Sequence, residues 1–414
     1  MKKENMDSVG IELYSRWREL QLSEITEPIK DTYNPDGSND FTYIGLEHIE
    51  QETLRLNSVG VSSDVTSNKF KFQTNDVLFG KLRPYFRKVV KPQFEGICST
   101  DIWVFRAKQG FDQDFLFYFL ANKEFVDTAN SGESGSRMPR ADWNHLKVTN
   151  WNVPPLQEQT AIASILSSLD DKIDLLHRQN KTLEQLAETL FRQWFVEEAE
   201  DYELGCFGDV ISIFDNLRVP VSSMEREKMK IGKLYPYYGA AKIMDYINDY
   251  IFDGEYVLMG EDGTVQTEEG FPILQMPTGK FWVNNHTHVL QAKKPYSNYL
   301  IYIFLKQTNI NHIITGAVQP KINQENLKLL DFPILPEEKI IDFVKITNDF
   351  WEKIKSNQIQ IRTLTQTRDT LLPKLMSGEV RLNLDLLDSQ DSKDFFNIIN
   401  QGNQVNPNNQ GGDK

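Results

Sequence analysis

A short run of basic and aromatic residues has the composition of a nucleic-acid contact. Residues 81–91 carry five basic side chains, two aromatic rings and no acidic residue. Cationic side chains bind phosphate oxygens, and an exposed ring can lie against a sugar or a base. A strand edge protected by lysine and arginine has a similar composition, so both interpretations stay open here. The candidates for DNA contact in this stretch are Lys81, Arg83, Tyr85, Arg87, Lys88 and Lys91.

Smaller groups of basic and amide side chains occur elsewhere. One lies in a loop rich in glycine and serine at residues 131–140, and others lie in the second half of the chain. In the second half, the region after residues 257–260 is acidic, whereas the matching region of the first half, 81–91, is basic. The candidates of the second half therefore lie after residue 279. Asparagine and glutamine can read adenine in the major groove, and arginine can read guanine. These further candidates for DNA contact are Arg137, Arg140, Lys280, Asn284, Asn285, Gln319 and Lys321.

The sequence shows no convincing catalytic constellation. It contains no GxGxxG motif, no P-loop and no adenine-methyltransferase signature of the Asn/Asp-Pro-Pro-Tyr/Phe type. On a strand, His286 and His288 would lie on one face, but no acidic or cysteine residue is spaced nearby as a third zinc ligand. The acidic residues at 253–255 and 261–262 are more typical of turns than of a metal site. We therefore expect no catalytic residues and no metal ligands in this chain.

The most regular stretch of the chain, residues 157–197, must position these candidates. Apolar residues recur there at alternating spacings of four and three, which is typical of a coiled-coil seam. At about 1.5 Å per residue, such a helix is roughly 60 Å long. A second helix is expected over residues 337–372, and Pro373 is expected to end or kink it. The residues expected to pair the helices are Leu169, Ile173, Leu176, Asn180 and Leu183 in the first, and Phe350, Ile354, Asn357, Ile361 and Leu364 in the second.

Each seam has one asparagine near its centre. In an antiparallel pair, Asn180 and Asn357 face each other if the midpoint falls near Arg178 and Ile359. A buried asparagine pair fixes register and orientation at some cost in stability. The alternative, in which each asparagine points to solvent at the edge of the seam, is about equally well supported by the sequence.

The chain contains an internal repeat with an offset of 181 residues. Gly135 matches Gly316 and Pro139 matches Pro320, and the match runs without a gap to the end of the second helix. In front of the helices, short apolar runs separated by turn signals predict mostly β units. The fold class is therefore α+β, with two β-rich domains in a pseudo-twofold tandem repeat, separated by two long antiparallel coiled-coil helices. The predicted boundaries are 1–153 and 201–335 for the domains, 154–200 and 336–380 for the helices, and 381–414 for a partly disordered tail.

Composition sets further limits. The net charge of −14 and the pI near 5.0 argue, taken alone, against nucleic-acid binding, because phosphate favours a basic surface. The two cysteines, Cys98 and Cys206, lie outside any CxxC pattern and fit a reducing cytoplasm. No stretch approaches 18 uncharged apolar residues. We therefore expect a cytoplasmic protein with no membrane partner.

Several motifs together resemble the specificity subunit of type I restriction–modification systems. These are PLQEQ at 155–159, NKTLEQLAETLFRQWF at 180–195, the internal repeat and RDTLLPKLMSGEV at 368–380. The second copy has LPEEKI at 335–340 and so departs from the PPLQEQ of the first. The resemblance covers roughly residues 10–382.

The resemblance implies that each globular domain reads one half of an asymmetric bipartite site in double-stranded DNA. It also implies that the helices fix the spacing, dock two methyltransferase subunits and lead to an assembly with restriction/translocase subunits. S-adenosylmethionine would bind the partner methyltransferase, so this chain would hold no cofactor and would not be an enzyme. The alternatives are a protein-binding scaffold with two heads on a coiled-coil spacer, or the specificity subunit of a type IIG/IIB-like restriction system. If partner subunits supply much of the cationic surface, an acidic chain can still read DNA within the assembly. The isolated chain is then expected to bind DNA weakly.

Overall fold

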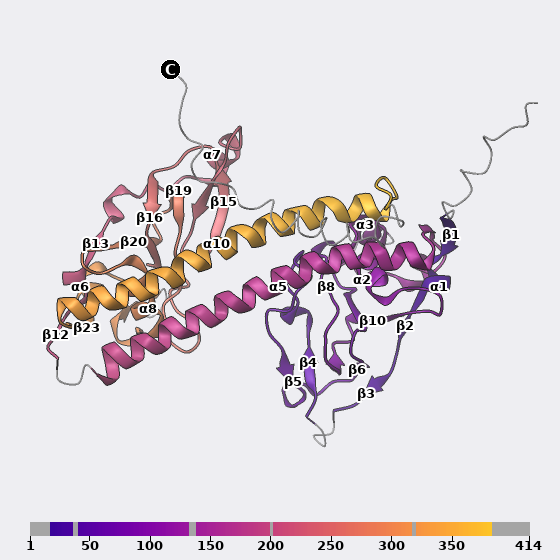
Figure 1. Ribbon diagram of the computed structural model, residues 1–414, viewed down its shortest axis with the longest axis horizontal. Helices are drawn as coiled ribbons and strands as arrows, with labels where there is room; N and C mark the ends of the chain where they lie inside the picture. Colours follow the sequence, from indigo (N-terminus) through magenta and orange to yellow (C-terminus); the bar gives the residue numbers. More distant parts are fainter. Residues whose placement is uncertain (1–16, 36–39, 132–137, 199–201, 317–319, 383–414) are drawn as a thin grey trace, which may run out of the picture. The chain divides into compact units, whose positions relative to one another are not determined.

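The computed structural model describes residues 17–35, 40–131, 138–198, 202–316 and 320–382 (Figure 1). The chain divides into two compact units. Unit 1 comprises residues 1–174 and 360–414, and unit 2 comprises residues 175–359. Two long helices, α5 (Leu156–Arg192) and α10 (Glu337–Met376), contribute residues to both units. The tail beyond residue 382, for which partial disorder is predicted, lies outside the described residues. Among the helices that the structure describes, none is long and apolar enough to cross a membrane.

Unit 1 contains two sheets and one two-stranded ribbon. The first sheet has the order β2-β10-β7-β8, with strands Thr26–Ile29, Ile102–Ala107, Val77–Gly80 and Val89–Val90. The second has the order β3-β6-β9-β4-β5, with strands Thr32–Tyr33, Lys69–Phe72, Gly96–Cys98, Thr42–Ile44 and Gly60–Val61. Only the β4–β9 pair is parallel among these described strands. β1 (Arg18–Gln21) pairs with β11 (Asn150–Val153), and the short helices are α1 (Leu22–Ile25), α2 (Gln113–Ala121), α3 (Lys123–Ser131) and α4 (Trp143–Leu146).

Unit 2 contains the corresponding sheets. The order β13-β20-β17-β18 is formed by Ile211–Ile213, Thr287–Ala292, Val257–Gly260 and Leu274–Gln275. The order β15-β14-β19-β16 is formed by Ile243–Ile247, Tyr235–Tyr238, Thr278–Val283 and Phe252–Glu255. β12 (Leu204–Cys206) pairs with β23 (Asp331–Pro333), and β21 (Ile314–Thr315) pairs with β22 (Lys321–Ile322). The short helices are α6 (Phe207–Val210), α7 (Ser223–Lys228), α8 (Asn298–Gln307) and α9 (Gln324–Lys328).

The two units share one topology. In the first sheet, β2, β10, β7 and β8 correspond in order to β13, β20, β17 and β18. In the second sheet, β6, β9, β4 and β5 correspond to β16, β19, β14 and β15, and the one parallel pair occurs at the same place, β4–β9 in unit 1 and β14–β19 in unit 2. The predicted α+β tandem repeat is therefore confirmed, although the aligned residues in the variable strands differ almost throughout.

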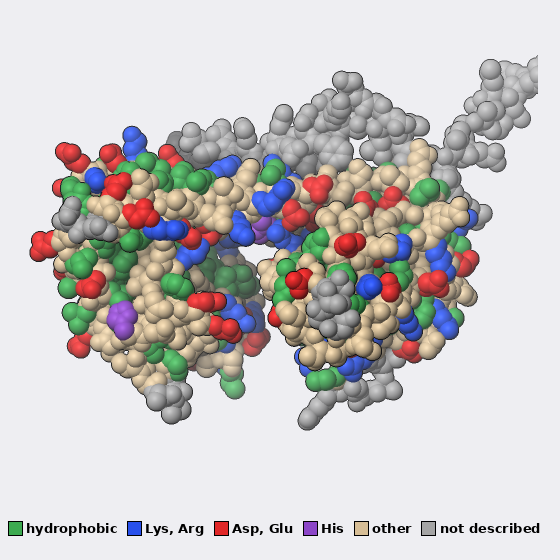
Figure 2. Space-filling view, turned by 90° about the horizontal axis from the view of Figure 1, so that it is seen from below, with side chains coloured by type: hydrophobic (Ala, Val, Ile, Leu, Met, Phe, Trp, Pro, Cys, Tyr) green, Lys and Arg blue, Asp and Glu red, His purple; other side chains and the backbone are tan. Residues whose placement is uncertain are grey.

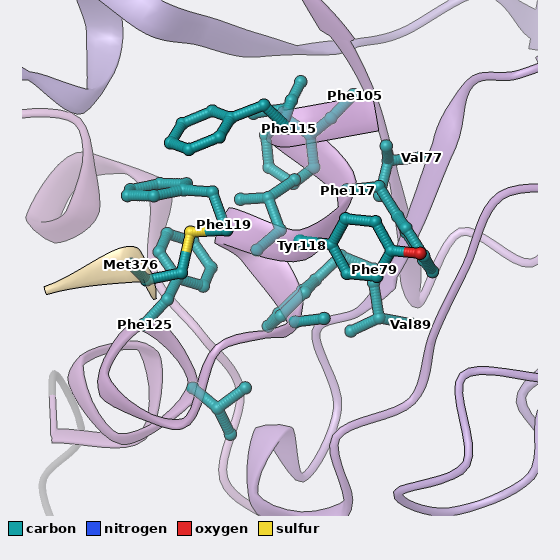
Figure 3. Packing of buried hydrophobic residues seen from close by; sticks show 14 of the residues in the cluster. Val77, Phe79, Val89, Phe105, Phe115, Phe117, Tyr118, Phe119, Phe125 and Met376 are labelled. Atoms are coloured by element: carbon teal, nitrogen blue, oxygen red, sulfur yellow. The ribbon is translucent and has the colours of Figure 1, made fainter. Parts of the chain in front are cut away.

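The core of unit 1 is built around α2, which is apolar on nearly every face. Asp112 caps the helix by accepting a hydrogen bond from the backbone N–H of Phe115 (2.8 Å). Figure 3 shows phenylalanine rings from α2, α3 and the first sheet in mutual contact, with Met376 of α10 beside them. Ile162, Leu166 and Leu372 belong to the same buried cluster. The long helices are thus fixed to the domain by apolar burial, which contributes about 1.5–3 kcal/mol for each large side chain.

The long helices run antiparallel within each unit. In unit 2, α5 and α10 meet at Asn180–Asn357 and again where the Phe191 ring lies 6.3 Å from that of Phe343, so residue numbers rise along one helix as they fall along the other. In unit 1 the Asp170 carboxylate meets Arg368 at 2.7 Å.

The predicted seam residues are mostly buried, with three exceptions, and the expected end of the second helix is corrected. Leu169, Ile173, Leu176, Ile354 and Leu364 are buried, whereas Leu183, Phe350 and Ile361 are half-buried and Trp351 takes a buried place that the spacing did not assign. The expected end at Pro373 is wrong, because α10 continues to Met376 and the Ser377 N–H still donates to the Pro373 carbonyl at 3.0 Å. A proline removes only its own N–H, and the buried Leu372 and Leu375 hold the last turn in place.

Asn180 and Asn357 face each other in the seam of unit 2. The Asn357 Nδ2 group donates to Asn180 Oδ1 at 2.8 Å, and Asn357 is completely buried. Its Oδ1 atom has no hydrogen-bond partner among the described residues. The alternative with both amides toward solvent is therefore ruled out by the structure.

Replacing both asparagines by leucine should stabilise unit 2 by about 1–2 kcal/mol, because a buried acceptor without a partner is removed. Replacing Asn180 alone should destabilise it, since the Asn357 amide then loses its main partner. Urea unfolding followed by helical circular dichroism measures both effects. A double variant that is no more stable than the native chain would show that the pair carries no cost.

Candidate nucleic-acid interface

Two segments of unit 1 that are far apart in the sequence run side by side at one end of the first sheet. The loop after β7 and the segment before α4 form a bridge between Leu82 and Arg140. The Arg83 N–H donates to the Pro139 carbonyl at 2.7 Å, and the Ala141 N–H donates to the Lys81 carbonyl at 2.9 Å. We call residues 81–88 and 138–141 the paired loops of unit 1. They bring the two basic stretches predicted from the sequence into one surface.

Arg83 and Tyr85 are the most available groups of these loops. Arg83 has a φ of 53°, in the left-handed region that non-glycine residues rarely adopt, and it begins the 3-10 helix η3 (Pro84–Phe86). Within the part of the chain that the structure describes, its guanidinium has no side-chain partner. The Tyr85 ring is 45% exposed and is held edge-on against Phe86 at 4.6 Å. The backbone thus fixes an arginine and an aromatic ring whose polar groups remain free for a ligand.

The other basic residues of the predicted stretch have internal roles. Arg87 donates from Nε to the Ala121 carbonyl at 2.6 Å, and burial lowers the pKa of its guanidinium although Asp369 opposes this. Lys88 donates to the Leu46 carbonyl at 2.5 Å, and Lys91 is paired with Asp114. These contacts engage Arg87, Lys88 and Lys91 within unit 1. All three remain predicted DNA contacts, but they are less available to a ligand than Arg83 and Tyr85, which a count of basic residues does not reveal.

Lys81 and Arg140 complete the cationic surface of unit 1. Arg140 is half exposed and lies 3.3 Å from the Asp101 carboxylate. Burial lowers the pKa of Lys81; Asp101 opposes this, whereas the charges of Arg140 and Lys30 lower it further. Such mutual repulsion among cations is relieved when an anion binds between them. Arg137, the remaining candidate in this region, lies outside the described residues.

Unit 2 has paired loops at the same place with the opposite charge. The loop after β17 and the segment from Pro320 form a bridge between Asp262 and Lys321. The Gly263 N–H donates to the Pro320 carbonyl at 3.2 Å, and the Ile322 N–H donates to the Glu261 carbonyl at 2.9 Å. We call residues 261–263 and 320–322 the paired loops of unit 2. Acidic side chains thus stand where unit 1 has Lys81 and Leu82, while Lys321 stands where unit 1 has Arg140.

A buried ionic cluster lies beneath the paired loops of unit 2. His288 Nδ1 lies 2.6 Å from Asp215 Oδ2, and its Nε2 donates to the Ile322 carbonyl at 2.8 Å. Arg218 lies 2.5 Å from Glu261. The sequence has no acidic residue at ligand spacing beside His288, but the fold brings Asp215 and Glu261 to it from distant parts of the chain.

The cluster has the spacing of a metal site but the bonding of an ion-pair network. Ligand atoms of Asp215, Glu261 and His288 lie within 4.8 Å of one another. Lys321 approaches Glu261 at 3.2 Å, and the Gln324 amide donates to Asp215 at 2.6 Å. Since each carboxylate already receives cations or N–H donors and both histidine nitrogens are engaged, the geometry favours a structural anchor for the segment that carries Lys321. His286 contacts Asp262 instead, at the surface.

The anchor should make the stability of unit 2 depend on pH. Burial alone raises the pKa of Asp215, but His288, the Val289 N–H and Arg218 outweigh it, so the pKa is lowered overall; the pKa of Glu261 is lowered in the same way. A lowered folded-state pKa contributes stability that is present at neutral pH and is lost as pH falls below about 4. Asp215→Asn should therefore cost about 3 kcal/mol at pH 7, and the difference should shrink in acid. Hydrogen exchange of the β20 amides measures this, and a difference that does not change with pH would contradict it.

The remaining candidates of unit 2 divide into exposed and buried groups. Asn285 is exposed and Lys321 is half exposed. The Lys280 ammonium lies 4.2 Å from the centre of the Tyr250 ring. Asn284 is buried and its Oδ1 accepts from the His286 N–H at 3.0 Å, so it shapes the turn before β20 and is less available to DNA than Asn285. Gln319 lies outside the described residues.

Sequence reasoning missed one exposed surface of unit 2. Met224 of α7 and Met244 and Tyr246 of β15 are at least half exposed, and lysines surround them. Acidic and basic residues occur in similar numbers between 222 and 250, so no charge signal marks the stretch. Only the structure shows which of those charges are paired internally.

Residues 14–185 and 199–365 match the family described as the type I restriction modification DNA specificity domain. The chain belongs to this family and carries its domain twice. It is 34% identical over 149 residues to a putative type I restriction enzyme specificity subunit, S.HindORF215P, of Haemophilus influenzae, a match that covers 36% of this chain and 37% of that protein.

Other relatives match more of the chain. It is 26% identical over 310 residues to the type I restriction enzyme MjaIX specificity subunit of Methanocaldococcus jannaschii, covering 66% of this chain and 71% of that protein. Among solved structures, the type I restriction–modification system S subunit from M. genitalium matches with a TM-score of 0.52 and 15% identity, covering 88% of this chain and 97% of that chain. That likeness supports the fold alone.

Proposed function

We propose that this chain is the DNA sequence-recognition subunit of a type I restriction–modification complex, and that each unit reads one half of an asymmetric bipartite site. The observation that carries the proposal is the pair of loops at the same place in both units, with different side chains on one backbone arrangement. Recognition of two unlike half-sites requires such a layout: a common scaffold and two different sets of reading groups.

In unit 1 the paired loops supply the groups for both kinds of DNA contact. Arg83 is placed to read a guanine edge, because its guanidinium carries two parallel N–H donors and is free of internal partners among the described residues. Lys81 and Arg140 bind the phosphates on either side, and Tyr85 lies against a sugar or a base. In unit 2, Glu261 and Gly263 stand at the positions of Lys81 and Arg83, and Lys321 stands at that of Arg140. Phosphate contact therefore falls to Lys280 and Lys321, and Asn285 is the exposed amide for base reading.

The long helices provide surfaces for partner subunits. In unit 2, Leu175 and Leu186 of α5 and Ile346 of α10 are exposed apolar residues on otherwise polar helices. A depression of about 400 Å³ is lined by Leu175, Thr182 and Leu183 together with Lys353. Exposed apolar groups of this kind are typical of interfaces. The partners that fit are two methyltransferase subunits, which bind S-adenosylmethionine and perform the chemistry, followed by restriction/translocase subunits.

In this proposal the chain is a non-catalytic subunit and holds no cofactor. It acts in the cytoplasm, where its DNA substrate is located. Figure 2 shows basic, acidic and hydrophobic side chains interspersed on the face that it presents, without one continuous basic field. The net charge of −14 therefore fits a subunit that reads bases while its partners supply much of the contact with phosphate.

Mapping of methylated bases in the genomic DNA of the host, with and without this gene, tests the function. The proposal predicts one bipartite motif with two different halves that loses its methylation when the gene is removed. An unchanged methylation map would contradict it and would favour the protein-binding scaffold.

A further inference from the structure

Unit 2 exposes several large apolar side chains outside its paired loops. On α7 and the turn after it, Met224 is 72% exposed and Ile231 is 71% exposed; on β15, Met244 and Tyr246 are 52% and 50% exposed. We call residues 223–234 together with β14 and β15 the α7–β15 surface. Apolar groups gathered on one small region mark an interaction site more often than a solvated face.

Ionic and backbone contacts join the two elements that carry this surface, α7 and β15. The Arg226 guanidinium lies 4.9 Å from the centre of the Tyr237 ring, and its Nε donates to Asp245 at 3.1 Å, which ties α7 to β15. The Asn248 N–H donates to the Met229 carbonyl at 2.8 Å. Because backbone and ionic contacts fix both elements, the exposed apolar side chains are presented in a defined arrangement.

The charges of this surface favour a polyanionic partner. Lys230 neutralises Glu227 at 2.5 Å and Asp245 at 3.1 Å. Glu225 completes the capping box of α7 by accepting from the Ser222 backbone N–H at 3.0 Å. The cations that remain exposed around the apolar groups are Lys228, Lys233 and Lys242. Among the described residues, no carboxylate forms an ion pair with these three lysines, and Lys233 lies 5.6 Å from the centre of the Tyr235 ring. In a chain with a net charge of −14, such exposed lysines beside apolar side chains are complementary to DNA rather than to an ordinary protein surface.

The shape of this surface fits the major groove. β15 is the edge strand of the four-stranded sheet β15-β14-β19-β16, and it pairs antiparallel with β14. Tyr237 pairs with Asp245 while Tyr238 pairs with Ile243, so Met244 is the extra residue of a β-bulge, a device that changes the direction of a side chain. The major groove has room for two adjacent strands, so the edge of this sheet at β15 and β14 can enter it. The C5 methyl of thymine is the apolar group that the groove displays.

We propose that the α7–β15 surface enters the major groove of the half-site read by unit 2, and that Met244 and Tyr246 recognise thymine through its methyl group. The inference rests on the proposed function of the chain and adds to it a named surface and a chemical group on the DNA. It requires the half-site of unit 2 to contain thymine on at least one strand.

Substitution of deoxyuridine for thymine tests the proposal, since it removes only the methyl group. The assembled complex with its methyltransferase subunits is titrated with duplexes of the mapped site, in which each thymine of the unit 2 half-site is replaced in turn. At one or more positions the native complex should bind about four-fold more weakly, the factor that corresponds to one buried methyl-sized group. Met244→Ala should bind the thymine duplex more weakly and should no longer distinguish it from the deoxyuridine duplex at that position.

Leu329→Ala is the matched control, because Leu329 is 69% exposed in unit 2 but lies after α9, outside this surface. It should keep the native preference for thymine. Equal binding of thymine and deoxyuridine duplexes by the native complex would overturn the proposal, as would a Met244→Ala chain that no longer assembles with methyltransferase subunits, which would make the surface a protein contact. If the proposed function itself fails, the complex instead shows no preference for the mapped site over an unrelated duplex.

Discussion

Replacement of Arg83 by alanine should weaken binding of the assembled complex to its own site by about 5- to 150-fold, the range expected for a lost bidentate contact to guanine. The effect should be large because the Arg83 guanidinium has no internal partner among the described residues, so its donors are available to DNA. Its backbone, with a φ of 53°, is held by the hydrogen bond to Pro139, and alanine removes the side chain without disturbing that bond. Titration of labelled duplex at fixed salt measures the change.

Two control variants separate reading from charge. Arg83→Lys keeps the cation but loses the planar fork, so it should restore much of the affinity for unrelated DNA without restoring discrimination at one base pair. Arg18→Ala removes an exposed arginine from β1 of the same unit and should leave both quantities unchanged. Equal losses on specific and unrelated DNA for Arg83→Ala would show that Arg83 contacts phosphate and not a base.

Replacement of Arg368 by alanine should destabilise unit 1 by about 3–5 kcal/mol, the cost of breaking a buried ion pair from one side. Arg368 is 2% exposed in the seam of α10 and binds the Asp170 carboxylate at 2.7 Å and the Thr53 carbonyl at 3.2 Å. The Tyr118 hydroxyl donates to the same carboxylate at 2.7 Å, so the network joins α2, α5, α10 and the loop at residue 53. Loss of the cation leaves the Asp170 carboxylate, 22% exposed, with Tyr118 as its remaining side-chain donor among the described residues.

The destabilisation caused by Arg368→Ala depends on whether the Asp170 carboxyl is charged. Burial raises the pKa of Asp170, and Arg368 is the strongest group that opposes the rise. In Arg368→Ala the carboxyl should therefore take up a proton at higher pH, which limits the cost in acid. The paired change Asp170→Asn with Arg368→Met should be less damaging than Arg368→Ala alone, because it buries no unpaired charge. Urea unfolding at pH 7 and pH 5 tests this; a double variant as unstable as the single one would show that shape, and not charge, dominates.

Regular spacing predicted the helices and the repeat, because both are properties of local sequence. The seam placed Asn180 and Asn357 in register, and the matching topology of the sheets follows from the duplicated spacing of strands. Arg368 lies within the predicted second helix, but its role depends on Asp170, which lies 198 residues away in the sequence. Contacts of that kind are not encoded in any local pattern.

The candidate site was predictable only in part, for the same physical reason. The basic stretch at 81–91 was visible, but the turn at η3 directs Arg87 to the Ala121 carbonyl, leaves Tyr85 exposed and leaves the half-buried Arg83 without a side-chain partner among the described residues. That turn depends on hydrogen bonds to Pro139 and to residues within the loop. The α7–β15 surface carries no net-charge signal in the sequence. In the structure, Arg226 and Lys230 neutralise Asp245, so this acidic residue does not offset the charge of the other lysines of the surface. The sequence does not show this pairing.

The central claim is that the two units read two separate halves of one DNA site. The most direct test exchanges residues 201–335 for the corresponding segment of a relative with a different target, followed by mapping of methylated bases in a host that carries the methyltransferase subunits. The account predicts a new motif in which one half is unchanged and the other half is that of the relative. A motif that is unchanged, or one that changes in both halves, would contradict it.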